Sequence, residues 1–296
     1  MQNIKDMKRS FLSKLHTTGL YCIIGALLLF PGVLLYQLLV LVPQGYGNAL
    51  ASPEATLYWI NAHSLQFLAY RLLLILGFAF MIGLPFTLFR IIVAQEILGS
   101  EGEDEEDEEI EDEEGDAENE EETGEEADKQ GQDGMPSFAW RGKGYALIAA
   151  WGGLFGLLST VVGTLASTIY LLVTASSITV PVTPPGNFAA FSGTFAFITY
   201  TMGGGLLAIA CLFFGAVIAR RGRNLWPGIW VLFSYMSLAL AALLSGSAVQ
   251  VAFAPNAGTA GQSILTTPAI LLFAIWVLWF GIMLIRLQPE YSEGTG

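Results

Sequence analysis

The chain has 296 residues, of which 53% are hydrophobic and 13% are charged, and its mean hydropathy is +0.56. This composition excludes an ordinary soluble domain. The apolar residues fall in six runs of about 20 residues or more, the length that a helix needs to cross a hydrocarbon core of about 30 Å. The sequence therefore predicts an all-α polytopic membrane protein, a bundle of six transmembrane helices.

The net charge of −13 is concentrated in one segment. Residues 101–133 hold 21 of the 26 acids and one base, so this segment carries −20 and the rest of the chain +7. Low-complexity acidic sequence repels itself and buries little apolar surface, so we expect a disordered acidic cytoplasmic loop over residues 99–139. Two interpretations stay open: a tether for a basic protein partner, or a solvated spacer between two spans.

Residues 1–98 are expected to hold an N-terminal cytoplasmic segment and the first two spans, at about residues 19–42 and 72–91. Proline interrupts both spans, at Pro31 and at Pro85. Each proline removes a backbone hydrogen bond, so each is expected to kink its helix.

A short helix is expected between these two spans. Ser52 has the character of an N-cap, Pro53 suits the first helical position, and Glu54 places an acid in the first turn. The helix over residues 53–62 is interpreted either as lying along the outer membrane surface or as an extension of the second span.

Residues 140–288 are expected to hold the remaining four spans, followed by a cytoplasmic tail at residues 289–296. Proline and glycine separate these runs where turns are needed. The four runs cover about residues 145–173, 191–219, 229–253 and 264–287.

The distribution of basic residues predicts the orientation. With the N-terminus inside and six spans, twelve of the thirteen bases lie on the inner side and only Arg71 lies on the outer side. Because positive charge favours the cytoplasmic side, we expect an integral protein of the plasma (inner) membrane with both termini in the cytoplasm. Anionic lipid headgroups, and not nucleic acid, are the expected partners of the inner basic fringe at Arg220, Arg221 and Arg223.

Small residues recur every fourth position in the third span, at Gly152, Gly156, Thr160, Thr164 and Thr168. Residues at this spacing share one helical face and let a second backbone approach closely in lipid. The face is therefore predicted to be a helix-packing seam, and the alternative is that its hydroxyl groups border a polar pathway. By the same reasoning spans three to five are expected to be central, whereas the sixth span, rich in large apolar residues, is expected to face lipid.

One polar group is a speculative site at the outer surface: Asn61, His63, Gln66 and Arg71. An interfacial histidine on wet surface is the alternative interpretation of this group. The sequence offers no recognisable catalytic, metal-binding or cofactor motif, so we expect no cofactor.

No ionisable residue falls at the centre of a span, and ion-coupled transporters usually have such residues. The sequence therefore disfavours ion-coupled transport. The first functional prediction is thus a non-enzymatic scaffold, accessory or regulatory subunit, for which a homo- or hetero-oligomer is one possibility. The alternative is a channel or permease for a neutral or weakly polar solute. An enzyme acting at the membrane interface ranks third.

Overall fold

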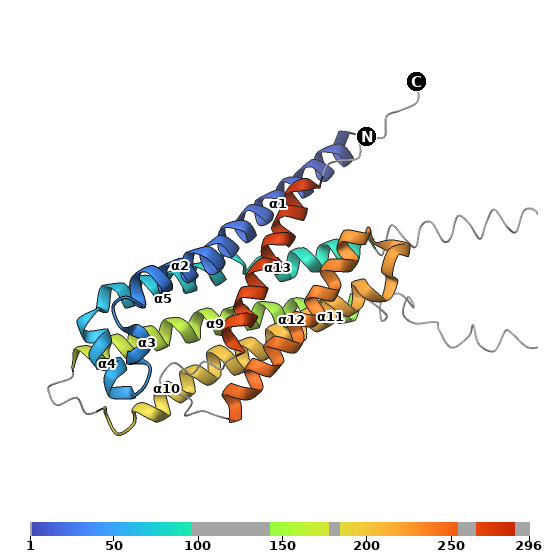
Figure 1. Cartoon of the computed structure of the whole chain (residues 1–296). Coiled ribbons are helices and arrows are strands. Elements are labelled where there is room, and N and C mark those ends of the chain that lie inside the picture. The colour runs from blue at the N-terminus through green and yellow to red at the C-terminus, as the bar shows by residue number, and fades with distance from the viewer. Residues whose placement is uncertain (1, 96–142, 178–183, 254–264, 288–296) are drawn as a thin grey trace, which may run out of the picture.

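The computed structural model describes residues 2–95, 143–177, 184–253 and 265–287, whose regular structure is entirely helical (Figure 1). The predicted acidic loop at 99–139 and the predicted tail at 289–296 lie outside the described residues. Six helices are long and apolar enough to cross a membrane, which confirms the predicted all-α bundle of six spans. They are Ser13–Leu41, Ser64–Gln95, Gly144–Ser176, Phe188–Arg220, Gly228–Phe253 and Thr266–Arg286.

The first span is a helix with two wide turns. It consists of α1 (Gln2–Leu27), the π-helical η1 (Leu28–Val33), α2 (Leu34–Tyr36) and the π-helical η2 (Gln37–Leu41). Pro31 lies inside η1. Since proline cannot donate the regular i→i−4 hydrogen bond, a widened turn is the local response where a kink was expected.

Two short helices, α3 (Tyr46–Ala49) and α4 (Pro53–Ala62), fold back over one end of the bundle. The α4 helix begins as its sequence predicts, because the Ser52 hydroxyl accepts a hydrogen bond from the Ala55 N–H at 3.2 Å. The Trp59 indole N–H donates to the Gln44 carbonyl oxygen at 2.8 Å and ties α4 to the end of the first span. At His63 the backbone leaves helical geometry, so α4 is separate from the second span.

The second span consists of α5 (Ser64–Phe80) and a further helical segment from Leu84 to Gln95. A turn over residues 81–83 separates the two, and Pro85 is the second residue of the segment that follows. The second span is thus interrupted at the place where the sequence predicts a kink.

The other four spans follow in order. The third is α9 (Lys143–Ser176), and the fourth consists of α10 (Phe188–Ala196), the π-helical η3 (Phe197–Met202) and α11 (Gly203–Leu225). The fifth is α12 (Gly228–Phe253) and the sixth is α13 (Thr266–Arg286).

The six spans form a closed ring. Each helix packs against two neighbours, in the order α1, α13, α12, α11, α9, α5 and back to α1. Successive spans run in opposite directions, and the His16 Nε2 atom lies 3.0 Å from the Leu287 carbonyl oxygen, so both ends of the described chain reach the same end of the bundle. We call this the arginine end, because Arg90, Arg220 and Arg286 also lie there, and the opposite end the α4 end.

The expectation that the sixth span faces lipid was wrong. Half of its most apolar window is buried inside the protein, compared with 22% in the first span. The Trp276 ring stacks on Phe233 with centroids 4.6 Å apart, and its indole N–H donates to the Phe233 carbonyl oxygen at 3.2 Å. Large apolar side chains are equally suited to lipid and to a protein interior, so size alone did not reveal the packing.

Candidate functional site

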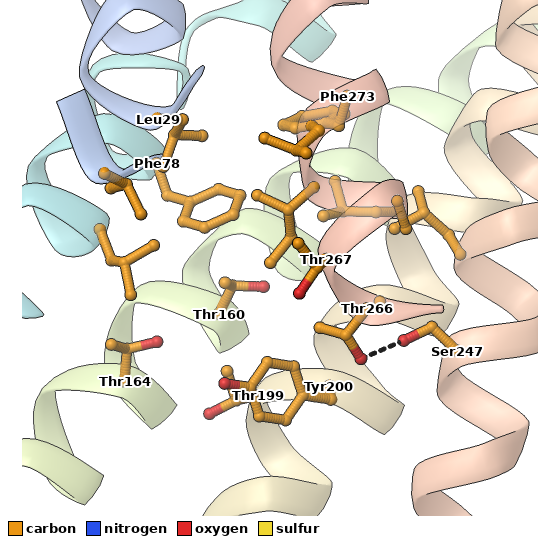
Figure 2. A pocket seen from close by; sticks show the side chains of 18 of the residues that line it. Leu29, Phe78, Thr160, Thr164, Thr199, Tyr200, Ser247, Thr266, Thr267 and Phe273 are labelled. Atoms are coloured by element: carbon orange, nitrogen blue, oxygen red, sulfur yellow. Dashed lines mark hydrogen bonds between the residues drawn. The ribbon is translucent and has the colours of Figure 1, made fainter. Parts of the chain in front are cut away.

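A cavity of about 80 Å³ lies at the centre of the ring, and all six spans line it (Figure 2). One water molecule needs about 10–15 Å³ by this measure, so the cavity has room for roughly five waters or one small solute. It lies in the half of the bundle nearer the α4 end. The first span contributes residues 29–37, the second residues 70–78 and the sixth its first turns at residues 266–273.

One wall of the cavity carries hydroxyl groups and the opposite wall is apolar. Figure 2 shows the polar side chains of α9, η3 and the beginning of α13 together, facing an apolar group that includes Leu29, Phe78 and Phe273. The hydroxyl groups of Ser247 and Thr266 lie 2.7 Å apart and bind one another. The residues of the polar wall are Thr160, Thr164, Thr199, Tyr200, Ser247, Thr266 and Thr267.

Two threonine hydroxyls of α9 are held by their own helix. Thr160 donates to the Gly156 carbonyl oxygen at 2.9 Å, and Thr168 donates to the Thr164 carbonyl oxygen at 2.6 Å. A hydroxyl oxygen that has donated its proton can still accept a hydrogen bond. The α9 wall can therefore offer an acceptor to a ligand without losing its intrahelical bonds.

All three π-helical segments reach the cavity. Leu29 and Val33 belong to η1, Gln37 to η2, and Thr199 and Tyr200 to η3. Such wide turns are rare and often occur at functional sites. These residues were not predicted to form a site; the sequence signals that could have indicated them are Pro31-Gly32, the lone Gln37 in an apolar run, and the glycines that follow η3.

The predicted packing face of α9 has two parts in the structure. Gly152 and Gly156 lie against α11, and a Cβ on Gly156 would be only 2.9 Å from the Leu207 backbone nitrogen. Further toward the α4 end, Thr160 and Thr164 line the cavity, and Thr168 is buried beyond it. The glycine part is a backbone contact and the threonine part is a cavity wall.

The four residues of the speculative outer site have different surroundings. Asn61 is exposed and Gln66 is half-buried. His63 stacks on Trp59, and its Nδ1 atom lies 3.2 Å from the Trp59 carbonyl oxygen. Arg71, by contrast, is buried, with only 8% of its surface exposed.

Arg71 lies near two aromatic residues, Phe67 on its own helix and Tyr46 of α3. Its guanidinium carbon is 5.2 Å from the centre of the Phe67 ring, an arrangement that favours a cation. Tyr46 packs against Trp59 and Tyr70, with ring centroids 4.8 Å and 6.2 Å away. Burial raises the pKa of Tyr46, and the charge of Arg71 acts in the opposite direction. The tyrosine therefore stays neutral beside a buried cation.

At the arginine end, Arg220 is exposed, and the side chains of Arg221 and Arg223 lie outside the described part of the structure. Among the described residues, no group of three histidine, cysteine, aspartate or glutamate side chains could hold a metal ion.

The six apolar helices identify the chain as a multi-pass helical membrane protein. No protein-family model matches it, and neither a curated protein nor a solved structure is significantly similar to it.

Proposed function

We propose that the protein is a permease for a small amphipathic solute, which it holds in the central cavity. The observation that carries this proposal is the cavity itself, enclosed by a ring to which every span contributes, with hydroxyl groups on one wall and apolar side chains on the other. A protein that only anchors a partner needs no such space. Small-molecule sites are typically apolar cavities with a few well-placed polar groups.

Access from the arginine end requires the spans to separate where they are now in backbone contact. A Cβ on Gly25 would lie 2.7 Å from the Gly77 carbonyl oxygen, and one on Gly281 would lie 2.8 Å from the Gly19 carbonyl oxygen. In this proposal the wide turns η1 and η3 are the places where the first and fourth spans bend as these contacts open. The cavity then alternates between the two ends, as in other transporters that hold their solute within the bundle.

The transport we propose is driven by the gradient of the solute alone. The sequence has no ionisable residue at the centre of any span, and such residues usually carry the coupling ions. Catalysis has no support among the residues around the cavity, so the proposed role is not enzymatic.

We further propose that the arginine end faces the cytoplasm of a cell bounded by a plasma (inner) membrane. The sequence supports that orientation, because with six alternating spans twelve of the thirteen bases are expected on the side of the N-terminus. The cavity then lies in the outer half of the bundle, beneath α4.

A scaffold that recruits a basic protein is the second candidate. The charge of −20 in residues 101–133 favours it. The two roles separate in one comparison, because deletion of residues 101–133 removes a recruited partner in a pulldown but leaves solute flux through the bundle unchanged.

Flux through proteoliposomes tests the permease proposal. Labelled lactamide and lactate are suitable probes, because they are small amphipathic solutes with the same skeleton. In Ala269→Phe, a buried residue of the cavity wall is enlarged, and this variant is expected to reduce flux to the level of protein-free liposomes. The matched control is Ala190→Phe, at an exposed position of α10, which should transport like the original protein. Flux of both probes equal to that of protein-free liposomes would contradict the proposal.

A further inference from the structure

A buried cation without a carboxylate partner lies at the α4 end. Arg71 is 8% exposed, and its Nε atom is buried without a hydrogen-bond partner. Among the side chains that the structure describes, Glu54 is the only acid, and it is exposed on the first turn of α4. A charge in such surroundings is unfavourable unless it binds something, and the Phe67 ring compensates it only in part.

Arg71 lies on the side of α5 that faces the cavity. Residues three and seven positions apart share a helical face, and Leu74 and Phe78, at these distances from Arg71, both line the cavity. At about 1.5 Å per residue, Arg71 is about 10 Å from Phe78 along the helix, toward the α4 end. Arg71 is not itself among the lining residues; it lies next to the lining residue Tyr70, on the side of the cavity toward the α4 end.

The surroundings of Arg71 connect with the cavity wall. Tyr46 is close enough to both Arg71 and the cavity residue Tyr200 for each to act on it electrostatically, and its ring packs on the cavity residue Tyr70. The side-chain oxygen of Gln44, which precedes α3 in the chain, is a second buried polar atom without a hydrogen-bond partner. Two buried polar atoms without a hydrogen-bond partner, Arg71 Nε and Gln44 Oε1, thus lie at the α4 end of the bundle.

We propose that Arg71 binds the carboxylate of a small organic acid whose apolar end enters the central cavity. A guanidinium group matches a carboxylate in charge and in its paired donors, and the contact is stronger in a site shielded from water. The size of the cavity limits the rest of the ligand to a short chain, and its hydroxyl wall suits one further polar group. This inference rests on the proposed function only in that the cavity holds the solute.

Lactate and lactamide provide the test, because they differ in the carboxylate that Arg71 would bind. Binding is measured by calorimetry on the full chain in nanodiscs of zwitterionic lipid, independently of flux. The original protein is expected to bind lactate at least about tenfold more tightly than lactamide. Arg71→Gln should bring the two affinities together, Arg71→Lys should retain part of the preference, and Arg90→Gln, at an exposed arginine of the other end, should keep all of it.

Thermal unfolding covers the case in which Arg71→Gln folds poorly. Arg71→Met removes a buried charge that has no carboxylate partner, so it should unfold at the same temperature as the original protein or higher when no ligand is present. Lactate should then raise the unfolding temperature of the original protein and not that of Arg71→Met.

Three results would overturn the inference. The first is equal affinity of the original protein for lactate and lactamide. The second is a preference for lactate that persists in Arg71→Gln. The third is stabilisation through Arg71 by phosphatidylglycerol in the nanodisc with no effect of lactate, which would assign the cation to a lipid phosphate. If flux depends on Ala269 but the protein binds lactate and lactamide equally, the permease proposal stands and this inference fails. If lactate binds through Arg71 but no flux is measured, this inference stands and the permease proposal fails.

Discussion

The two ends of the bundle use small residues in different ways. Toward the arginine end, glycine brings backbones into contact, as Gly25 does with Gly77 and Gly19 with Gly281. Toward the α4 end, threonine and serine side chains line a cavity, and the helices contain π-helical turns. On the predicted packing face of α9 the change falls between Gly156 and Thr160, one turn apart. Glycine contacts continue at this end, where a Cβ on Gly163 would lie 3.1 Å from the Thr199 backbone nitrogen, so the hydroxyl side chains and not a lack of glycine distinguish the cavity.

Trp276→Ala is expected to have the largest effect, because it opens a hole in the aromatic cluster beneath the cavity. Trp276 is 1% exposed and stacks on Phe233. Truncation of a buried tryptophan typically costs about 3–5 kcal/mol of stability. Thermal or denaturant unfolding in detergent measures it. Trp151→Ala is the matched control, since Trp151 is 47% exposed, and an equal loss in both variants would show that the packed region is no tighter than the outer surface.

Gly25→Val tests the backbone contact between the first two spans. Its Cβ would lie 2.7 Å from the Gly77 carbonyl oxygen, which cannot move without its helix. Overpacking of this kind typically costs about 1–3 kcal/mol, which the same unfolding experiment would detect. Gly205→Val is the control, because a Cβ on Gly205 meets nothing within 4 Å although this glycine also lies in a spanning helix. If both variants lose the same stability, helix propensity and not close contact explains the effect.

The sequence predicts the fold well because the bilayer makes length and hydropathy sufficient for finding spans. It does not predict which side of a span is buried, because lipid and protein interior are similarly apolar. Trp276 illustrates this limit: its partner Phe233 is 43 residues away along the chain. The sixth span looks like a lipid-facing helix until the fifth is placed beside it.

The candidate site was predictable only in part. The packing face of α9 follows from a four-residue spacing within one span. The cavity is lined by residues from all six spans, and no regular spacing in the sequence relates residues of different spans. Arg71 was expected at the outer edge, where a charged end can reach water. It is buried, with Phe67 and the α3 residue Tyr46 as neighbours, and the Trp59 bond to Gln44 that holds α4 folded back has no sequence signature.

Ser247→Ala tests the contribution of the hydroxyl wall of the cavity to stability. It removes the 2.7 Å hydroxyl pair with Thr266, one of the bonds between the fifth and sixth spans at the α4 end. Side-chain hydrogen bonds between membrane helices contribute about 0.6 kcal/mol on average, so the expected loss is small. A double-mutant cycle with Thr266→Val isolates the pair. A coupling above about 2 kcal/mol, beyond the range measured for such bonds, would mean that the hydroxyl wall holds the ring closed as firmly as the glycine contacts do.

The smallest effect is expected at the start of α4, which covers the cavity end. The Glu54 backbone N–H and the Ser52 hydroxyl hold the pKa of the Glu54 carboxyl below its usual value. A group whose folded pKa is depressed contributes stability above its unfolded pKa, and that stability is lost as the pH falls through the folded pKa. The start of α4 should therefore become slightly less stable as the pH falls below about 4.5, the ordinary pKa of this carboxyl group.

Unfolding temperatures across this pH range, compared with those of Glu54→Gln, measure the effect. The variant should lose the acid-dependent part, and Ser52→Ala should reduce it by removing one of the two hydrogen bonds. Because Glu54 is fully exposed, solvent and salt screen the interaction, and the difference should shrink further at high ionic strength. If the acid sensitivity is unchanged in Glu54→Gln, it does not originate at the start of α4. The α4 end would then depend on pH no more than the glycine contacts do, and the two ends of the bundle would not differ in this respect.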